Sequence, residues 1–232
     1  MSTVYIISAP SGSGKSTLVN ELRKSVDNLE FSISYTTRPP RGSEQDGHEY
    51  FFISREEFER LLAGDAFLEH AEVFGNYYGT ARRFLHDARQ HGHDLLLDID
   101  VQGERQVKQK IPEAISIFVL PPTRKELERR LRRRSQAEVL AEEVIQKRLA
   151  AAAREIENYG NYDYILINDQ LERSIDELKT IVLAERVRAC GPRSAEEEKW
   201  LVTAERHRQS NMSQTLQPIL ESFALSAAPG GR

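Results

Sequence analysis

The chain has 232 residues, 39% of them hydrophobic, and its 36 acidic residues outnumber its 32 basic ones to give a formal net charge of -4. This composition excludes a disordered chain and predicts one α/β domain that carries insertions or an appendage. The negative charge excludes a global positive field for nucleic acid or anionic membranes. The single cysteine, Cys190, excludes an internal disulfide and a multi-cysteine zinc site. Without a targeting segment or a membrane-spanning run, the expected location is the cytoplasm.

The predicted elements alternate along the chain. Short apolar runs without polar alternation are typical of strands buried on both faces of a parallel sheet, and four occur, at residues 4–7, 95–97, 115–120 and 164–167. Helical segments lie between them, and Ser54, Thr123 and Ser174 each precede a glutamate by three residues, as in a capping box at a helix start. This alternation predicts a doubly wound parallel sheet of α/β class, with ligands outside the carboxyl ends of the strands.

Two stretches interrupt this alternation. From Phe31 to about Ala81 the pattern predicts a small β-rich insertion, and from about 126 to 159 an arginine-rich helical segment. After about Arg188 an extension begins, in which Gly191 ends one helix, Ser194 starts another, and the last two dozen residues are expected to be mobile.

A phosphate-binding loop follows the first apolar run, at Ala9, Pro10, Ser11, Gly12, Ser13, Gly14, Lys15, Ser16 and Thr17. Binding a triphosphate requires several N–H donors that point at one place, and a glycine-rich turn that leads into a helix supplies them. Lys15 can reach the β- and γ-phosphates, and the Ser16 hydroxyl can ligate Mg²⁺. The first position of the usual pattern holds Ala9 instead of glycine. The alternative, a turn without function, fits poorly with the strand before and the amphipathic helix after it.

A second phosphate site is predicted around the rigid Pro39-Pro40 corner. Arg38 and Arg41 flank this corner and are suited to bidentate capture of a phosphate monoester, and Tyr50 and Tyr78 add hydroxyl donors. Taken one segment at a time, surface arginines and core tyrosines are an equally good interpretation.

Two charged clusters have open interpretations. Asp98 and Asp100 follow the most apolar strand, where they can hold hydrated Mg²⁺ or cap the next helix. Five arginines crowd into residues 129–134, with Lys147-Arg148 further on. They form a nucleic-acid patch, a solvated face or a lid over the triphosphate, and we favour the lid because the basic density is local in an acidic protein.

An ordered series of motifs resembles the guanylate kinases over residues 3–188. After the phosphate loop come Ser34-Tyr35-Thr36-Thr37-Arg38-Pro39-Pro40-Arg41, Gly47 to Tyr50, Phe67-Leu68-Glu69, Gly75-Asn76-Tyr77-Tyr78-Gly79-Thr80, Asp98-Ile99-Asp100-Val101-Gln102-Gly103, and Asn168-Asp169. Arg133-Arg134-Ser135 departs from the family's Gly-Arg-Gly, which predicts a stiffer lid loop.

The resemblance implies a domain at 1–188, with a GMP-binding insertion at about 33–90 and a lid at about 123–159, followed by an extension at 189–232. It implies that Arg38, Arg41, Tyr50 and Tyr78 hold the GMP phosphate, and that Ser34, Glu69 and Thr80 read the guanine. Asp98 and Asp100 would contact the acceptor nucleotide and, through water, the metal. Arg130, Arg134 and Arg148 would contact the transferred phosphate, and Asn168 would lie near the adenine of ATP.

We therefore expect the reaction ATP + GMP = ADP + GDP, with Mg²⁺, with dGMP as a second acceptor, and with Lys15, Arg38 and the three lid arginines as the catalytic groups. No nucleic acid or membrane partner is expected, and the sequence leaves open whether the protein is a monomer or a homo-oligomer. Two alternatives are a related kinase for another phosphorylated acceptor and a guanylate-kinase-like module that binds partners without catalysis.

Overall fold

The computed structural model describes residues 2–73, 75–138 and 142–224, with side chains except at 134–138 and 224. By its contacts the chain divides into two compact units. The first contains the chain up to Ile6 and Val26–Ile115, and the second contains Ile7–Ser25 and the chain from Ser116 onward. None of the helices in the described residues combines the length and apolar character that a membrane span needs.

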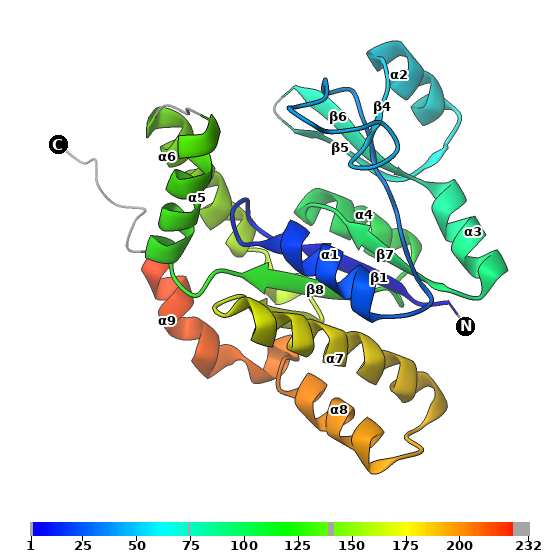
Figure 1. Cartoon of the computed structure of the whole chain (residues 1–232), viewed down its shortest axis with the longest axis vertical. Helices are drawn as coiled ribbons and strands as arrows, with labels where there is room; N and C mark the ends of the chain where they lie inside the picture. The colour runs from blue at the N-terminus through cyan, green and yellow to red at the C-terminus, as the bar shows by residue number, and fades with distance from the viewer. Residues whose placement is uncertain (1, 74, 139–141, 225–232) are drawn as a thin grey trace. The chain divides into compact units, whose positions relative to one another are not determined.

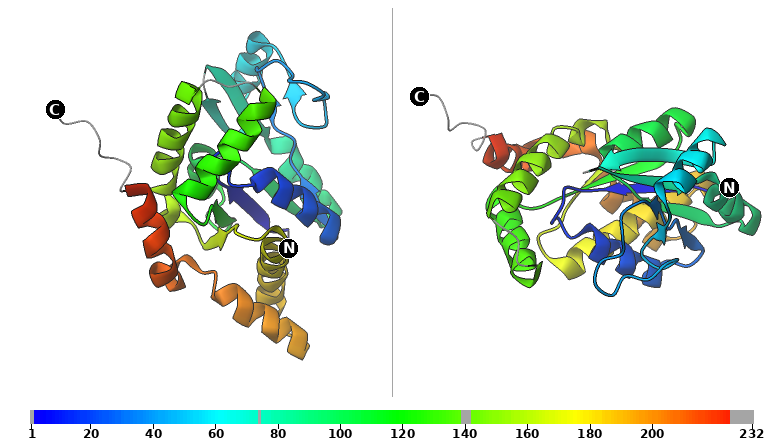
Figure 2. Two further views of the ribbon diagram at one scale, coloured as in Figure 1. Left: turned by 60° about the vertical axis from the view of Figure 1, so that its left-hand side comes forward. Right: turned by 90° about the horizontal axis from the view of Figure 1, so that it is seen from above.

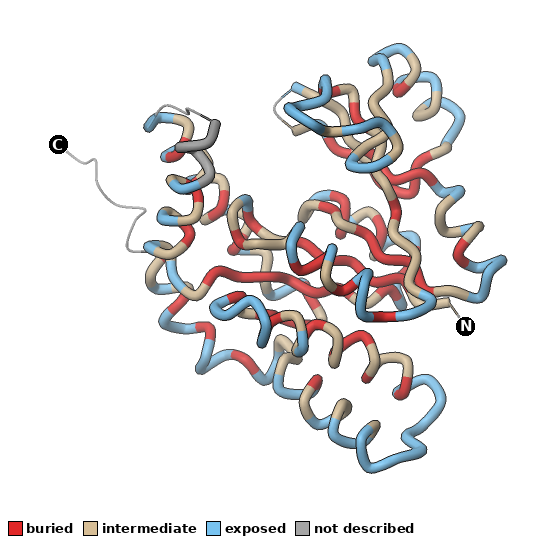
Figure 3. The backbone as a smooth tube through the Cα atoms, in the orientation of Figure 1, coloured by how far each residue is buried: buried red, intermediate tan, exposed pale blue. Residues whose placement is uncertain are grey.

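The central sheet has the strand order β2-β7-β1-β8-β9. Its five strands are β1 Val4–Ser8, β2 Leu29–Phe31, β7 Asp94–Asp98, β8 Ile115–Leu120 and β9 Tyr164–Ile167. The pairs β2–β7 and β8–β9 are parallel. β1 is buried along its whole length, as is nearly all of β8 (Figure 3), which is why these strands lack polar alternation. The predicted α/β class with a parallel sheet is confirmed.

β2 is a member of this sheet that the sequence pattern does not predict. The pattern places Phe31 in the inserted region, but Glu30 and Phe31 pair with Leu95 and Leu96 of β7. All three β2 residues are only half-buried because the strand lies at the sheet edge. An edge strand of three residues therefore leaves no continuous apolar run to detect.

The first unit also contains a four-stranded sheet of order β4-β3-β6-β5, which confirms the β-rich insertion (Figure 1). The bounds are β3 Tyr35–Thr36, β4 Phe51–Phe52, β5 Phe67–Val73 and β6 Asn76–Ala81, with helices α2 Arg55–Ala63, α3 Arg82–His91 and α4 Val101–Lys110. The predicted cap of α2 is present, since the Ser54 hydroxyl accepts from the Glu57 N–H at 3.1 Å. Helix α4 packs on β5.

The second unit contains α1 Lys15–Ser25, α5 Arg124–Glu138, α6 Glu142–Ile156, α7 Leu171–Cys190, α8 Ala195–Glu205 and α9 Ser213–Ala224, with 3₁₀ turns at Tyr159–Asn161 and Gln209–Asn211. The predicted start of α5 is confirmed, because the Glu126 N–H donates to the Thr123 hydroxyl at 3.1 Å. The start predicted at Ser174 is wrong. Ser174 is buried inside α7, and its hydroxyl donates to the Ile167 carbonyl at 3.3 Å, since the same residue spacing also occurs within helices.

Two further expectations are corrected in this unit. The stiffer lid loop predicted at Arg133-Arg134-Ser135 is continuous helix within α5. The last two dozen residues were expected to be mobile, but residues 213–224 form α9, which lies against α5 and α6 (Figure 2); residues 225–232 lie outside the described part of the chain. The predicted end of a helix before Gly191 is confirmed, because α7 ends at Cys190 and Gly191 has a φ of 77°.

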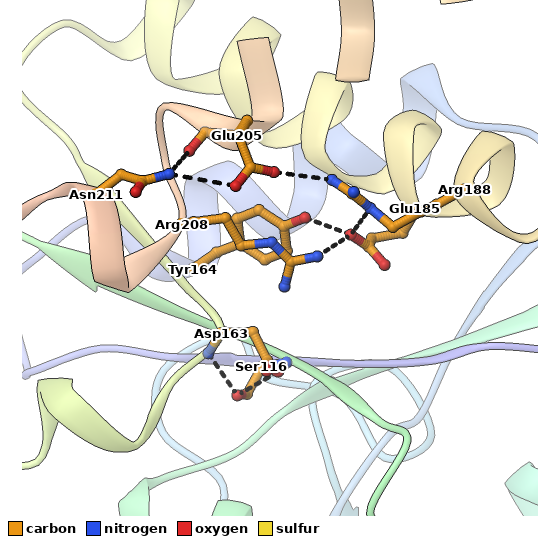
Figure 4. Close-up of polar contacts among 8 residues, drawn as sticks. All are labelled: Ser116, Asp163, Tyr164, Glu185, Arg188, Glu205, Arg208 and Asn211. Carbon is orange, nitrogen blue, oxygen red and sulfur yellow. Dashed lines mark hydrogen bonds and ion pairs between the residues drawn. The ribbon is translucent and has the colours of Figure 1, made fainter. Parts of the chain in front are cut away.

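The extension continues the edge of the central sheet beyond β9. The Ile165 N–H donates to the His207 carbonyl at 2.8 Å, and the Gln209 N–H donates to the Asp163 carbonyl at 3.0 Å. Glu185 of α7 accepts from the Tyr164 hydroxyl and, at 2.9 Å, from Arg208 (Figure 4). The extension is therefore hydrogen-bonded to β9 and α7.

Figure 4 shows a second carboxylate that ties α7 to the extension. Arg188 bonds Glu185 at 3.1 Å and Glu205 at 3.3 Å, and Asn211 donates to the Glu205 carbonyl at 2.8 Å. Helix α8 also packs along α7 (Figure 1). The described part of the extension, up to residue 224, is thus a packed part of the second unit.

Candidate active site

The phosphate loop joins β1 to α1 in the second unit, as the sequence predicts. Gly12 and Gly14 have φ values of 93° and 92°, in the region that favours glycine. A Cβ at Gly12 would lie 2.9 Å from Leu131 of α5, and a Cβ at Gly14 would overlap the side-chain amide of Asn168. Both glycines are therefore required by conformation and by close approach.

Helix α1 begins at Lys15, directly after these glycines. The helix has no acidic residue in its first turn, so its N-terminal N–H groups and dipole favour an anion there. Ser16 and Thr17 are exposed in this first turn. The loop and the helix start therefore have the conformation that the predicted phosphate site requires.

Asn168 and Arg130 both bond to the backbone of the phosphate loop. The Ser13 carbonyl accepts from the Asn168 amide at 2.7 Å and from the Arg130 guanidinium at 3.2 Å. Arg130 also donates to the Asn168 carbonyl at 2.8 Å and to Glu126 at 2.8 Å. The predicted ATP residue Asn168 and the predicted lid residue Arg130 thus meet at the phosphate loop.

Two further arginines of α5, Arg129 and Arg132, are held by carboxylates. Hydrogen bonds from Arg129 and Arg130 lower the pKa of Glu126 to about 2. Arg132 joins α5 to α6 through Glu142 at 2.5 Å, and this contact lowers the pKa of Glu142 to about 2. Much of the predicted basic density is therefore neutralised locally.

Arg148 is half-buried on α6, within the second unit. Arg134 belongs to α5, but its side chain lies outside the described residues. The position of the Arg134 guanidinium relative to the phosphate loop is thus a prediction from the sequence.

In the first unit, the four-stranded sheet brings the predicted phosphate-binding residues together. Arg38 follows β3 and is 6% exposed, with its guanidinium 5.3 Å from the ring centre of Tyr50. The rings of Tyr50 and Tyr78 lie 5.8 Å apart. Arg41 is exposed in the following loop. Three of the four predicted residues therefore form one cluster, with Arg41 at its exposed side.

Glu44 is a member of this cluster that the sequence did not reveal. Its two carboxylate oxygens accept from the two terminal nitrogens of Arg38 at 2.9 and 3.0 Å, and one also accepts from the Arg41 N–H at 2.8 Å. Burial lowers the pKa of Arg38, but hydrogen bonds to Glu44 and Tyr78 outweigh it and raise the pKa above its ordinary value. Glu44 lies in an irregular loop, where no periodicity relates it to Arg38.

Glu69 of β5 is 3% exposed and lies opposite Thr80 of β6. Burial raises the pKa of Glu69 to about 7, although Thr80 opposes part of this rise. A Cβ at Gly103 would lie 2.6 Å from the Glu69 carboxylate, so glycine is needed there for the close approach of α4. Ser34 lies just before β3 and Thr80 is fully buried, so the predicted guanine-reading residues all belong to this sheet or its immediate flank.

The two predicted aspartates differ in their surroundings. Asp100 is the N-cap of α4, and its carboxylate accepts from the N–H groups of Gln102 at 3.0 Å and Gly103 at 2.8 Å. Asp98 is the last residue of β7 and is half-buried. The capping interpretation is therefore correct for Asp100, and a carboxylate so engaged has fewer lone pairs left for a ligand.

Comparison with known proteins shows the family of the chain. The family model for guanylate kinase matches residues 1–185. The chain is 57% identical to the guanylate kinase of Koribacter versatilis over 228 residues, 98% of either chain. It is 50% identical to that of Escherichia coli strain K12 over 188 residues, 80% of this chain and 89% of the relative.

A solved structure supports the same family assignment. The crystal structure of guanylate kinase from Anaplasma phagocytophilum superposes with a TM-score of 0.66 at 37% identity, covering 79% of this chain and 86% of that one. The described extension helices α8 and α9 lie beyond the segment that the family model matches. On these matches, the chain belongs to the guanylate kinase family.

Proposed function

We propose that this protein transfers the γ-phosphoryl group of ATP to GMP, giving ADP and GDP, and that it accepts dGMP as a second acceptor. The observation that carries the acceptor assignment is Glu69, a carboxylate buried beside Thr80. Guanine presents an N1–H and an N2 amine on one edge, and one carboxylate can accept both. A phosphorylated sugar has no such edge, and adenine lacks this donor pair.

The acceptor phosphate would bind at the cluster of Arg38, Tyr50 and Tyr78, with Arg41 beside it. Arg38 already makes a bidentate pair with Glu44, which shows that its two terminal nitrogens point to one place where two oxygens can sit. A phosphate offers the same pair of oxygens. A phosphate that takes this pair of nitrogens would displace the Glu44 carboxylate from Arg38, while the 2.7 Å bond from Arg38 to the Pro39 carbonyl can remain.

The donor triphosphate would bind at the phosphate loop, with Lys15 on its β- and γ-phosphates. Arg130 donates a hydrogen bond to the Ser13 carbonyl of this loop, so its guanidinium can stabilise negative charge on the transferring group. Arg134 and Arg148 are further candidates for this role. Asn168 would border the adenine. An acceptor phosphate is already ionised near neutral pH, so direct in-line attack needs no strong base, and catalysis consists of positioning and charge stabilisation.

The donor set also fits Mg²⁺, a hard cation that prefers oxygen ligands. The exposed hydroxyl of Ser16 in the first turn of α1 would hold it directly, and Asp98 suits the water-mediated role better than Asp100, whose carboxylate caps α4. When bound, the ion would neutralise charge on the β- and γ-phosphates.

The experiment is a coupled ADP-release assay with ATP, Mg²⁺ and each of GMP, AMP, CMP and UMP. We expect rapid turnover with GMP and background rates with the others. Comparable turnover with AMP would overturn the guanine assignment, and no turnover with any of them would favour the non-catalytic module. Lys15→Met should abolish turnover, while Lys24→Met, at the exposed end of α1, should retain it.

A further inference from the structure

Three side chains with metal-binding chemistry meet at the edge of the central sheet, and none of them belongs to the nucleotide sites described above. Glu30 lies on the edge strand β2, His91 is the last residue of α3, and His93 precedes β7. The parallel register places Leu29 opposite Asp94 and Glu30 opposite Leu95, so Glu30 lies beside the turn that carries the two histidines.

The two imidazoles face the same carboxylate oxygen. Nδ1 of His91 lies 2.6 Å and Nδ1 of His93 lies 2.9 Å from Oε1 of Glu30. One ligand atom from each residue lies within 4.8 Å of the other two. Around a zinc ion with bonds of about 2.0–2.2 Å, tetrahedral ligand atoms are separated by about 3.4 Å. Small rotations of three side chains would therefore admit an ion.

The backbone holds the two histidines in place. Gly92 between them has φ 70° and ψ 21° and ends α3, with its N–H bonded to the Arg89 carbonyl at 3.2 Å. The His93 N–H donates to the Ala88 carbonyl at 2.9 Å. This left-handed glycine turn is a stable helix terminus, and a cation at the end of α3 is also favoured by the helix dipole.

The donors and their exposure define the class of ion. Two imidazole nitrogens and one carboxylate oxygen suit Zn²⁺ and similar borderline divalent ions, whereas Mg²⁺ and Ca²⁺ prefer sites made of oxygen. The side chains of His91, His93 and Glu30 are 58%, 35% and 29% exposed. An ion can thus enter from solvent and keep a water as its fourth ligand.

We propose that Glu30, His91 and His93 form a binding site for a divalent transition metal ion, with zinc as the ion that fits best. The bound ion links the edge strand β2 to the turn between α3 and β7. It therefore adds a further link to an edge of the sheet where β2 pairs with β7 through three residue pairs. The site stands apart from the Mg²⁺ proposed for ATP in donor chemistry and in residues.

The test is a zinc titration of the untagged, chelator-stripped full chain without nucleotide, by calorimetry and by competition with a chromophoric chelator. We expect one equivalent of zinc to bind, and at least about tenfold weaker binding in each of His91→Gln, His93→Gln and Glu30→Gln. His86→Gln is the matched control, since His86 lies exposed on the same helix.

Cys190 needs its own control because it is exposed and thiolates bind zinc. Zinc binding that survives Cys190→Ser and fails in His93→Gln supports the site; the reverse pattern, or equal binding in all variants, overturns it. Circular dichroism establishes that each variant is folded. As an independent measure, zinc should raise the melting temperature of the parent protein and not of His93→Gln, and an equal rise in both would count against the proposal.

Discussion

The side-chain amide of Asn168 donates a 2.7 Å hydrogen bond to the carbonyl of Ser13, although 155 positions separate the two residues in the chain. This bond fixes the segment after β9 against the phosphate loop. It also leaves no room for a side chain at Gly14, whose Cβ would overlap the Asn168 amide.

Gly14→Ala should therefore damage the donor site. The added methyl group would have to displace Asn168, and alanine at φ 92° is strained. We expect the KM for ATP to rise by at least about tenfold, equal to about 1.4 kcal/mol, with a smaller change for GMP. The control is Gly160→Ala, where a Cβ would meet nothing within 4 Å. Equal kinetics for the two variants would contradict the packing argument.

GMP binding should weaken as the pH falls below about 7. The pKa of Glu69 without ligand is about 7 because the carboxyl is buried, and only the ionised form accepts both guanine donors. The KM for GMP, measured between pH 6 and 8.5 at saturating ATP, should rise toward low pH in the parent protein. The exposed Glu72→Gln on the same strand should keep this profile, and Glu69→Gln should lose it.

The same group makes the ligand-free protein less stable at higher pH. The folded-state pKa of Glu69 lies above its ordinary value of 4.5, so the folded state binds the proton more tightly. The free energy of unfolding therefore falls as the pH rises from 4.5 to 7, by up to roughly 3 kcal/mol for a shift of this size. Glu69→Gln has no such loss and should be the more stable protein above pH 7 in urea denaturation. A parent protein whose stability rises between pH 5 and 7 relative to this variant would contradict the assignment.

Arg38→Lys should weaken acceptor binding without affecting the donor. A lysine cannot form the two-nitrogen contact that Arg38 makes with Glu44. We expect kcat/KM for GMP to fall by at least about tenfold and the KM for ATP to stay constant. Arg55→Lys on the exposed face of α2 is the control, and a matching loss there, or an equal rise in both KM values, would argue against the proposed phosphate contact.

Arg208→Ala should destabilise the second unit. Arg208 bonds to Glu185 at 2.9 Å and covers the ring of Tyr164 at 4.3 Å, and burial together with Glu185 raises the pKa of Tyr164 above its ordinary value. We expect the free energy of unfolding to fall by about 1–3 kcal/mol, as for loss of a charged hydrogen-bond partner. The exposed Arg206→Ala should cost far less. Identical denaturation curves would mean that the network contributes nothing.

Local patterns predicted most of the regular structure. The apolar runs at β1, β7, β8 and β9 and the caps at Ser54 and Thr123 depend on neighbours in the sequence, so they could be recognised there. Ser174 has the same spacing yet lies within α7. The sequence does not predict helix α9 because Pro218 lies inside it, and proline ordinarily breaks the interior of a helix.

The contacts within the candidate site can be predicted less completely from the sequence, because most of them join residues that are not neighbours in the chain. Glycine-rich and Arg-Pro motifs predict the phosphate-binding segments. Contacts such as Glu44 on Arg38 and Asn168 on Ser13 depend instead on irregular loops and distant segments that meet in space. The burial that raises the pKa of Glu69 likewise depends on Gly103 and the packing of α4. Such relationships require the folded chain.

The central claim is that Glu69 reads guanine through two donors on one edge. The most direct measurement is kcat/KM for GMP and for IMP, which retains N1–H and lacks the N2 amine, in the parent protein and in Glu69→Gln. We predict that the parent prefers GMP by at least about tenfold, since a buried acceptor left unpaired costs about 1–3 kcal/mol, and that the preference largely disappears in Glu69→Gln. An unchanged GMP-to-IMP ratio in that variant would contradict the account.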